Sequence, residues 1–377
     1  MNARGVNILP IIGFIILILV LFTGLILFRN DDSNTGGSTG MFEGIMSKAK
    51  TIGGYIVDEN GELSAQGKDK ISVDVASADV NIYTHDEDSV KAHLHGEVKT
   101  TSEDIVPYLE LKEDGHTIVV RIQSPQVTNH FFPYYSADLR LDVTIPESWM
   151  NTLEIGTTSG DISAQKLTGS DIVLKSSSGD TEIQSITGEN ITAETVSGKI
   201  RIKMINGENG FFKSSSGDLS IDEVNFSGKF EANTVSGDFS INRLECKEGK
   251  FDASSGDIEL KEIIAGKIKS EAVSGTIKVK MVNGSAELKT SSGDINAEFE
   301  KNFESIKAQS ASGDICLTIP SDSEFALDAK TVSGVIKCKD FPVSIISSGD
   351  RELVGNVGSG RSELKVNTTS GNILIQE

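Results

Sequence analysis

The sequence predicts an all-β protein: a β-solenoid with coils of about 19–20 residues, behind an N-terminal transmembrane helix. Two observations predict the solenoid. A Ser-Gly pair recurs along the chain at a nearly constant interval, and apolar and polar residues alternate on both sides of each pair. A third observation, an uncharged apolar run near the N-terminus, predicts the helix.

The apolar run is the first element of the chain. Its 21 residues, Ile8–Phe28, are long enough to cross a bilayer as a helix. A cleaved signal peptide is the alternative, but the run exceeds an ordinary h-region and no small-residue cleavage site follows it. We expect residues 1–29 to form an uncleaved single-pass anchor with the amino terminus inside. Residues 30–54, which begin with the Gly-, Ser- and Asp-rich stretch Asn30–Gly40, are predicted to be a flexible linker.

Residues 55–150 are predicted to form irregular first coils or a cap. Strand-like alternation continues here without the period, and Ala78 stands where later coils carry glycine. A cap is expected because an open solenoid end exposes unpaired strand edges. The aromatic cluster His130–Tyr135 either packs beneath the first coils or forms a surface loop that contacts a partner or lipid.

Residues 151–377 carry the regular repeat. The glycines of the Ser-Gly pairs stand at 160, 179, 198, 217, 237, 256, 275, 293, 313, 334 and 371. This interval is too short for a two-helix repeat and matches one coil of a β-solenoid. The longer last gap contains an irregular unit around Ser348–Asp350.

Alternation within each repeat predicts which side chains are buried. The second and fourth residues after the glycine are mostly apolar, as in Ile277 and Val279, whereas Lys278 between them is polar. The third, fifth and seventh residues before the glycine are also expected to point inward. A second corner is predicted at Gly169, Gly188, Gly207, Gly266 and Gly284, which makes two strands and two turns per coil. Since Trp and Tyr together number only six, no aromatic-centred core is expected.

The segment "LRLDVTIPESWMNTLEIGTTSGDI" and the "SGDI" units after it resemble the bacterial putative-adhesin domain of unknown function. The resemblance covers roughly residues 55–377. That family includes the Lia-type membrane proteins of cell-envelope stress operons. The resemblance implies a β-solenoid behind a membrane anchor, facing the cell envelope, and it implies no catalytic residues.

The Ser-Gly-Asp string itself invites a functional hypothesis. Aspartates stacked on successive coils can share calcium, or each can bond its own turn; the candidates are Asp161, Asp180, Asp218, Asp238, Asp257, Asp294 and Asp314. The structural role is the stronger expectation, because Lys199, Thr276, Val335 and Asn372 interrupt the row. The serine is predicted to point inward at a tight corner, where the glycine permits the bend.

Other candidate sites are weaker. His93 and His95 lie on one strand face with His85 not far away, and zinc would need a further ligand. Cys246, Cys316 and Cys338 show neither a disulfide framework nor zinc spacing. The net charge of −20 argues against a nucleic-acid partner. A glycosidase or lyase would need a singular carboxylate constellation, and none stands out.

These observations predict a non-catalytic, single-pass cell-membrane protein with most of its chain outside the cytoplasm. We expect an adhesin-like interaction protein or an envelope-stress accessory protein, whose partner is a protein or an envelope glycan. Neither a cofactor nor a resident metal is expected. The alternatives are a carbohydrate-active β-helix and a purely structural spacer.

Overall fold

The computed structural model describes residues 52–124, 135–301 and 303–377, which belong to one compact unit, Ile52–Glu377. The described residues are all-β, with 25 strands in a single hydrogen-bonded sheet and one short 3-10 helix, Glu103–Ile105. Within these ranges, no helix has the length and apolarity needed to cross a membrane. The predicted membrane segment Ile8–Phe28 lies outside the described residues, as do residues 30–51 of the predicted linker and residues 130–134 of the aromatic cluster.

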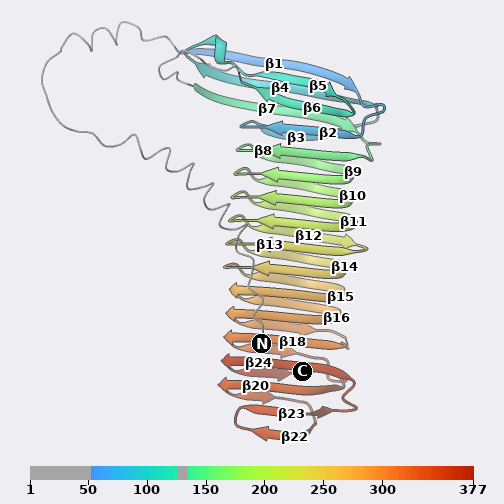
Figure 1. The fold of residues 1–377 in the computed structure, drawn as a ribbon, viewed down its shortest axis with the longest axis vertical. Helices are drawn as coiled ribbons and strands as arrows, with labels where there is room; N and C mark the ends of the chain where they lie inside the picture. Colours follow the sequence, from blue (N-terminus) through green and yellow to red (C-terminus); the bar gives the residue numbers. More distant parts are fainter. Residues whose placement is uncertain (1–51, 125–134, 302) are drawn as a thin grey trace, which may run out of the picture. The chain divides into compact units, whose positions relative to one another are not determined.

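The regular part is a stack of coils, each here called a rung, that wind in one direction (Figure 1). The rungs pair in parallel, and β9, β10 and β11 match residue for residue, so that Ile183 lies between Ala164 and Ile202. Between β15 and β16 the register shifts over residues 260–267. The rungs are formed by β9 (Ile162–Ser176), β10 (Thr181–Thr195), β11 (Ile200–Ser214), β12 (Leu219–Phe226), β13 (Lys229–Thr234), β14 (Phe239–Ala253), β15 (Ile258–Ser274), β16 (Ile277–Ser292), β17 (Ile295–Phe299) and β18 (Ser305–Ser312). The predicted β-solenoid is confirmed.

The second corner differs from the prediction. In β9, β10 and β11 the strand runs unbroken through Gly169, Gly188 and Gly207, and the pairing continues on both sides of the bend. This corner is therefore a bend within one strand of 15 residues, rather than a turn between two strands. The glycine is needed there for space: a Cβ on Gly188 would lie 2.6 Å from the carbonyl oxygen of Gly169.

The predicted inward positions form the core. Ile277 and Val279 are buried while Lys278 is exposed, and the same alternation recurs along the stack. A third buried position lies seven residues after the glycine and was not predicted. It is occupied by Leu167, Ile186, Ile205, Val224, Leu244 and Ile263. In the next rung, which is one residue shorter, Met281 is buried six residues after the glycine. Stacking of rungs buries all of these rows, because a single coil cannot cover its own apolar face.

An aromatic stack in the middle of the solenoid was also not expected. Phe230 lies between Phe212 and Phe251, with ring centroids 5.2 and 5.6 Å away. Glycine makes room for the rings: Phe230 pairs with Gly210 on one neighbouring rung and with Gly249 on the other, and a Cβ on Gly210 would lie 2.5 Å from the Phe226 ring. The large and small residues of adjacent rungs thus compensate one another.

The N-terminal end is closed by antiparallel strands. The rung of β2 (Lys70–Val75) and β3 (Asp79–His85) pairs on one side with β8 (Thr152–Thr157) and β9, and on the other with β6 (Thr117–Gln123) and β7 (Tyr135–Pro146). Beyond it, β1 (Gly53–Ser64), β4 (Ser89–Thr100) and β7 form an antiparallel sheet, and β5 (Tyr108–Asp114) pairs with β6.

The C-terminal end is closed in a similar way. The last rung, β24 (Ser362–Ser370) and β25 (Ile373–Gln376), is inserted between β18 with β19 (Ile315–Thr318) and β20 (Phe325–Ser333) with β21 (Ile336–Cys338). The segment around Ser348–Asp350 belongs to a hairpin of β22 (Val343–Gly349) and β23 (Glu352–Val357) that pairs antiparallel with β20. Figure 1 shows β24 between β18 and β20, with the hairpin outermost.

Candidate functional site

The glycines of the Ser-Gly-Asp corner stack on one another along the solenoid. A Cβ added to any of them, from Gly160 to Gly371, would lie 1.7–2.2 Å from the carbonyl oxygen of the corner residue in an adjacent rung. None of these glycines has a positive φ, so conformational freedom is not what the corner requires. The requirement is close approach of backbones. Ala78 takes the same place in the β2–β3 rung, with its carbonyl oxygen against Gly160.

The serine before the glycine does not point inward; this prediction was wrong. All eleven of these serines are exposed, because the chain turns at the corner and the strand alternation stops there. The inward hydroxyl belongs to the residue three positions before the glycine. In nine rungs it bonds the backbone of a corner glycine, as Ser214 Oγ does with Gly217; the others are Thr157, Ser176, Thr195, Thr234, Thr290, Ser310, Thr331 and Thr368.

The aspartates form a ladder along the outside of the corner. In each step, Oδ1 accepts a hydrogen bond of 2.7–3.3 Å from the backbone N–H at the equivalent position of the next rung, so the partner is not the aspartate's own turn. The acceptors are Asp79, Asp161, Asp180, Asp218, Asp238, Asp257, Asp294 and Asp314. The ladder therefore connects rungs through a charge-assisted bond.

Lys199 stands where other rungs carry the ladder aspartate, and its side chain replaces the missing link to the next rung. Its backbone N–H bonds Asp180, and its Nζ lies 3.0 Å from Asp218 on the next rung. The backbone bond from Lys199, aided by Arg201, lowers the pKa of Asp180. The side-chain bond from Lys199, with the backbone bond from Asp238, lowers the pKa of Asp218. Both carboxylates are thus held in the ionised form.

The calcium hypothesis receives no geometric support from this arrangement. Each aspartate engages Oδ1 with a backbone N–H, whereas a calcium site brings 6–8 oxygen ligands to one point. Across the described ranges, only one group of three or more His, Cys, Asp or Glu side chains offers ligand atoms close together, and it lies elsewhere.

That group is His93, His95 and Asp142, with one ligand atom from each within 4.8 Å of the others. Both histidines lie on β4 and their rings stack with centroids 4.6 Å apart. Asp142 lies on β7, directly opposite His93. His85, considered with them from the sequence, is not part of the group, since its Nε2 bonds the carbonyl of Ser89.

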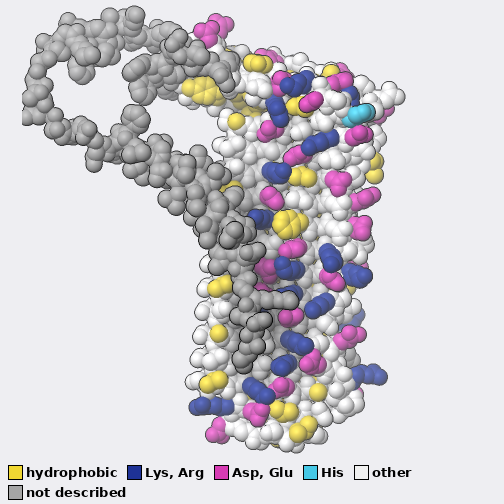
Figure 2. Space-filling view, viewed as in Figure 1, with side chains coloured by type: hydrophobic (Ala, Val, Ile, Leu, Met, Phe, Trp, Pro, Cys, Tyr) yellow, Lys and Arg dark blue, Asp and Glu magenta, His cyan; other side chains and the backbone are white. Residues whose placement is uncertain are grey.

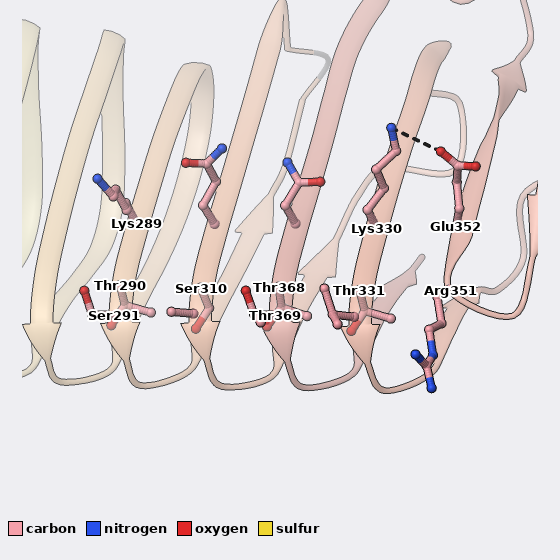
Figure 3. Close-up of a pocket in the computed structure, with 14 residues that line it drawn as sticks. Lys289, Thr290, Ser291, Ser310, Lys330, Thr331, Arg351, Glu352, Thr368 and Thr369 are labelled. Carbon is pink, nitrogen blue, oxygen red and sulfur yellow. Dashed lines mark ion pairs between the residues drawn. The ribbon is translucent and has the colours of Figure 1, made fainter. Parts of the chain in front are cut away.

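A shallow hollow crosses the outer face of β16, β18, β24 and β20 (Figure 3). Lys289, Gln309, Asn367 and Lys330 occupy the same position on these four neighbouring strands. Arg351 and Glu352 close one end, and Lys330 Nζ lies 3.1 Å from a Glu352 carboxylate oxygen. The hollow therefore offers cationic, amide and hydroxyl groups on a chain whose net charge is −20.

Elsewhere the outer face carries charges of both signs, and Figure 2 shows Lys and Arg mixed with Asp and Glu along the visible side. Many of them pair between rungs. Glu154, for example, accepts from Lys70 on one neighbouring rung and from Lys175 on the other, and these bonds lower its pKa. The outer face thus carries regularly repeated ion pairs, together with single exposed apolar side chains such as Val235 and Val273.

The three cysteines carry free thiols. Burial and the neighbouring Glu248 raise the pKa of Cys246 to about 12, and burial with Asp340 raises the pKa of Cys338 to about 11. A thiol that stays protonated at neutral pH is a poor nucleophile and a poor metal ligand.

The chain was compared with curated proteins and with solved structures. No curated protein matches the chain. Solved structures that align with it include a putative cell adhesion protein from Clostridium sporogenes (12% identity, 85% of this chain and 99% of that chain, TM-score 0.19) and a putative adhesin from Parabacteroides distasonis (11% identity, 84% and 97%, TM-score 0.39). A putative lipid binding protein from P. distasonis aligns at 16% identity (85% and 96%, TM-score 0.39). These values are too low to carry an argument about function.

A comparison with models of protein families identifies the family of this chain. The model of the Toastrack family matches the chain twice, over residues 68–242 and 211–376. Together the two matches cover nearly all of the described solenoid and its caps. They confirm the family resemblance found in the sequence. The chain belongs to the Toastrack DUF4097 family, whose function is unknown.

Proposed function

We propose that the protein is a non-catalytic, adhesin-like interaction protein of the bacterial cell envelope. Residues 1–29 anchor it in the cell membrane, and the solenoid stands outside the cytoplasm and binds its partner through its outer face. A role as an accessory protein in envelope stress is compatible with this arrangement. The partner is an envelope glycan or another envelope protein.

The observation that carries the proposal is the repetition of the outer face. Equivalent positions recur on every rung at the strand spacing of about 4.8 Å, which gives a rigid, regular surface suited to an extended ligand. The hollow lined by Lys289, Lys330 and Arg351 is the candidate contact. Its amide, hydroxyl and cationic groups match a hydroxyl-rich anionic polymer.

The described carboxylates whose pKa values are shifted give no support to glycosidase catalysis. A glycosidase needs a carboxylic acid whose pKa is raised so that it can donate a proton. Glu154 and Asp180 instead have lowered pKa values, because Lys70 in the first case and the Lys199 backbone in the second bond to the charged form.

The full-length chain, purified in detergent, should be tested on a glycan array together with a hydrolysis assay. We expect retention of anionic glycans without turnover, and weaker retention by Lys289→Ala combined with Lys330→Ala. Lys203→Ala combined with Lys278→Ala, both outside the hollow, is the matched control. Turnover would support the carbohydrate-active alternative, and no ligand in the array or in a membrane cross-linking pull-down would support a structural spacer.

Protease treatment of intact cells tests the orientation. We expect the solenoid to be degraded from outside, because the anchor places it there. Full protection of the chain in intact cells, with degradation only after lysis, would contradict the proposal.

A further inference from the structure

The antiparallel sheet at the N-terminal end brings together four potential metal ligands on its solvent face. In the pairing of β4 with β7, His93 lies opposite Asp142. In the pairing of β4 with β1, His95 lies opposite Asp58. Since alternate residues of a strand share a face, His93 and His95 project to the same side, and their strand neighbours carry one carboxylate on each flank.

The distances within this group are short. His95 Nε2 lies 3.2 Å from Asp142 Oδ2, and His93 Nε2 lies 2.7 Å from Asp58 Oδ1. One ligand atom from each of His93, His95 and Asp142 falls within 4.8 Å of the other two. Bonds of about 2.0–2.2 Å to zinc draw such atoms together with only small side-chain rotations.

A second layer of contacts orients the carboxylate. Asn81 of β3 donates a hydrogen bond of 2.8 Å to Asp142 Oδ1, which leaves Oδ2 directed toward His95. Support of this kind is typical of metal sites, where a neighbouring hydrogen bond fixes each ligand. The histidines and Asp142 are each partly buried, with 28–39% of the side chain exposed, so an ion can reach them.

We propose that His93, His95 and Asp142 bind one divalent transition-metal ion, for which zinc is the natural probe. Two imidazole nitrogens and one carboxylate oxygen are ligands that zinc accepts, and Asp58 or water completes a four-coordinate shell. The ion joins β4 to β7, which are antiparallel neighbours separated along the chain: His95 and Asp142 are 47 residues apart. The site is independent of the glycan-binding hollow, so either proposal can fail without the other.

The test is a zinc titration of the full-length chain in detergent, after metal is removed with a chelator. Competition with a chromogenic chelator measures affinity and stoichiometry. We expect one zinc ion per chain, and a loss of at least about tenfold in affinity for His93→Gln, for Asp142→Asn and for the supporting variant Asn81→Ala. Added zinc should raise the melting temperature of the wild type but not of Asp142→Asn.

His116→Gln and His85→Gln are the matched controls, because His116 lies in the turn between β5 and β6 and His85 bonds Ser89. Both should bind zinc like the wild type. Circular dichroism in chelator should show that all variants fold alike. The proposal is overturned if the wild type binds no zinc, if His93→Gln and Asp142→Asn bind it as tightly as the wild type, or if only His116→Gln loses it.

Discussion

At the residue scale, the serine, glycine and aspartate of the corner have structural roles that differ from the predicted ones. Glycine is required because the backbone of the adjacent rung occupies the space of a Cβ, serine faces solvent, and aspartate bonds the next rung. The hydroxyl that points inward sits three residues before the glycine, as Ser214 does at Gly217. Each residue of the corner except the serine therefore connects rungs or provides the space that brings them together.

Replacement of a stacked glycine should therefore destabilise the protein. In Gly217→Ala the new Cβ would lie 1.7 Å from the Gly198 carbonyl oxygen, and backbone cannot move aside as a side chain can. We expect a loss of about 3 kcal/mol in unfolding free energy, at the upper end of overpacking effects. Gly156→Ala is the control, because its Cβ would meet no atom closer than 3.8 Å. Equal effects in urea denaturation would refute the close-approach explanation.

The aspartate ladder predicts a dependence of stability on pH. The folded-state pKa values of Asp180 and Asp218 are lowered, so their contribution is present above the unfolded value of about 3.9 and is lost as the pH falls through the folded values. Asp180→Asn combined with Asp218→Asn keeps an acceptor oxygen but removes the charge. We expect this variant to lose less melting temperature than the wild type between about pH 6 and pH 3. Parallel curves would show that the two charges contribute nothing.

At the element scale, a strand of this protein is a bent ribbon with one buried row of side chains. The burial of β16 alternates from Ile277 to Val279, and these two residues pair with the apolar Ile258 and Leu260 of β15. Where a large side chain appears in the core, its neighbour is small, as Gly210 is beside Phe230. The alternation is a property of each strand, but the fit of side chains is a property of adjacent strands.

Adjacent residues of β16 should therefore respond very differently to the same change. Ile277→Asp places an unpaired charge at a fully buried position, and we expect a loss of about 3–5 kcal/mol. Lys278→Asp lies on the exposed face and should change stability by about 0.5 kcal/mol or less. Thermal unfolding of the two variants checks this, and similar melting temperatures would refute the strand assignment.

At the scale of the whole solenoid, neither the first nor the last rung of the chain lies at an end of the stack. The β2–β3 rung lies between β6–β7 and β8–β9, and the β24–β25 rung lies between β18–β19 and β20–β21. Antiparallel strands cover both ends, which reduces the open strand edge that stacked sheets expose. The C-terminal hairpin leaves Ile345 and Ile346 of β22 exposed.

This insertion predicts an unusual pattern of hydrogen exchange. Amides of residues 362–376 should exchange as slowly as those of 258–290, although they are close to the end of the chain, because β24 is bonded on both sides. Residues 343–349 should exchange faster, because among the described strands β22 pairs with β23 alone. Mass-spectrometric exchange measures both segments. Rapid exchange across 362–376 would contradict the inserted rung.

Much of this architecture could be predicted because the repeat is local. A period of 19–20 residues and the alternation of residues such as Ile277 and Lys278 specify parallel, in-register rungs, since each rung needs the next to bury its apolar row. The serine prediction failed because strand parity was extended through a turn, where it no longer applies. The role of the glycine was missed because a steric requirement between rungs leaves no local signal beyond the glycine itself.

The amino-acid sequence by itself determined the β-solenoid, its period and the core rows on either side of the Ser-Gly corner, because each depends on residues within one or two rungs. The tertiary structure alone decided which rung lies beside which at the two ends and placed Asp142 opposite His93. Those contacts join segments about 40 to 60 residues apart that do not follow one another along the chain as consecutive rungs. A pairing of this kind is selected by the free energy of the assembled sheet, which no local pattern encodes.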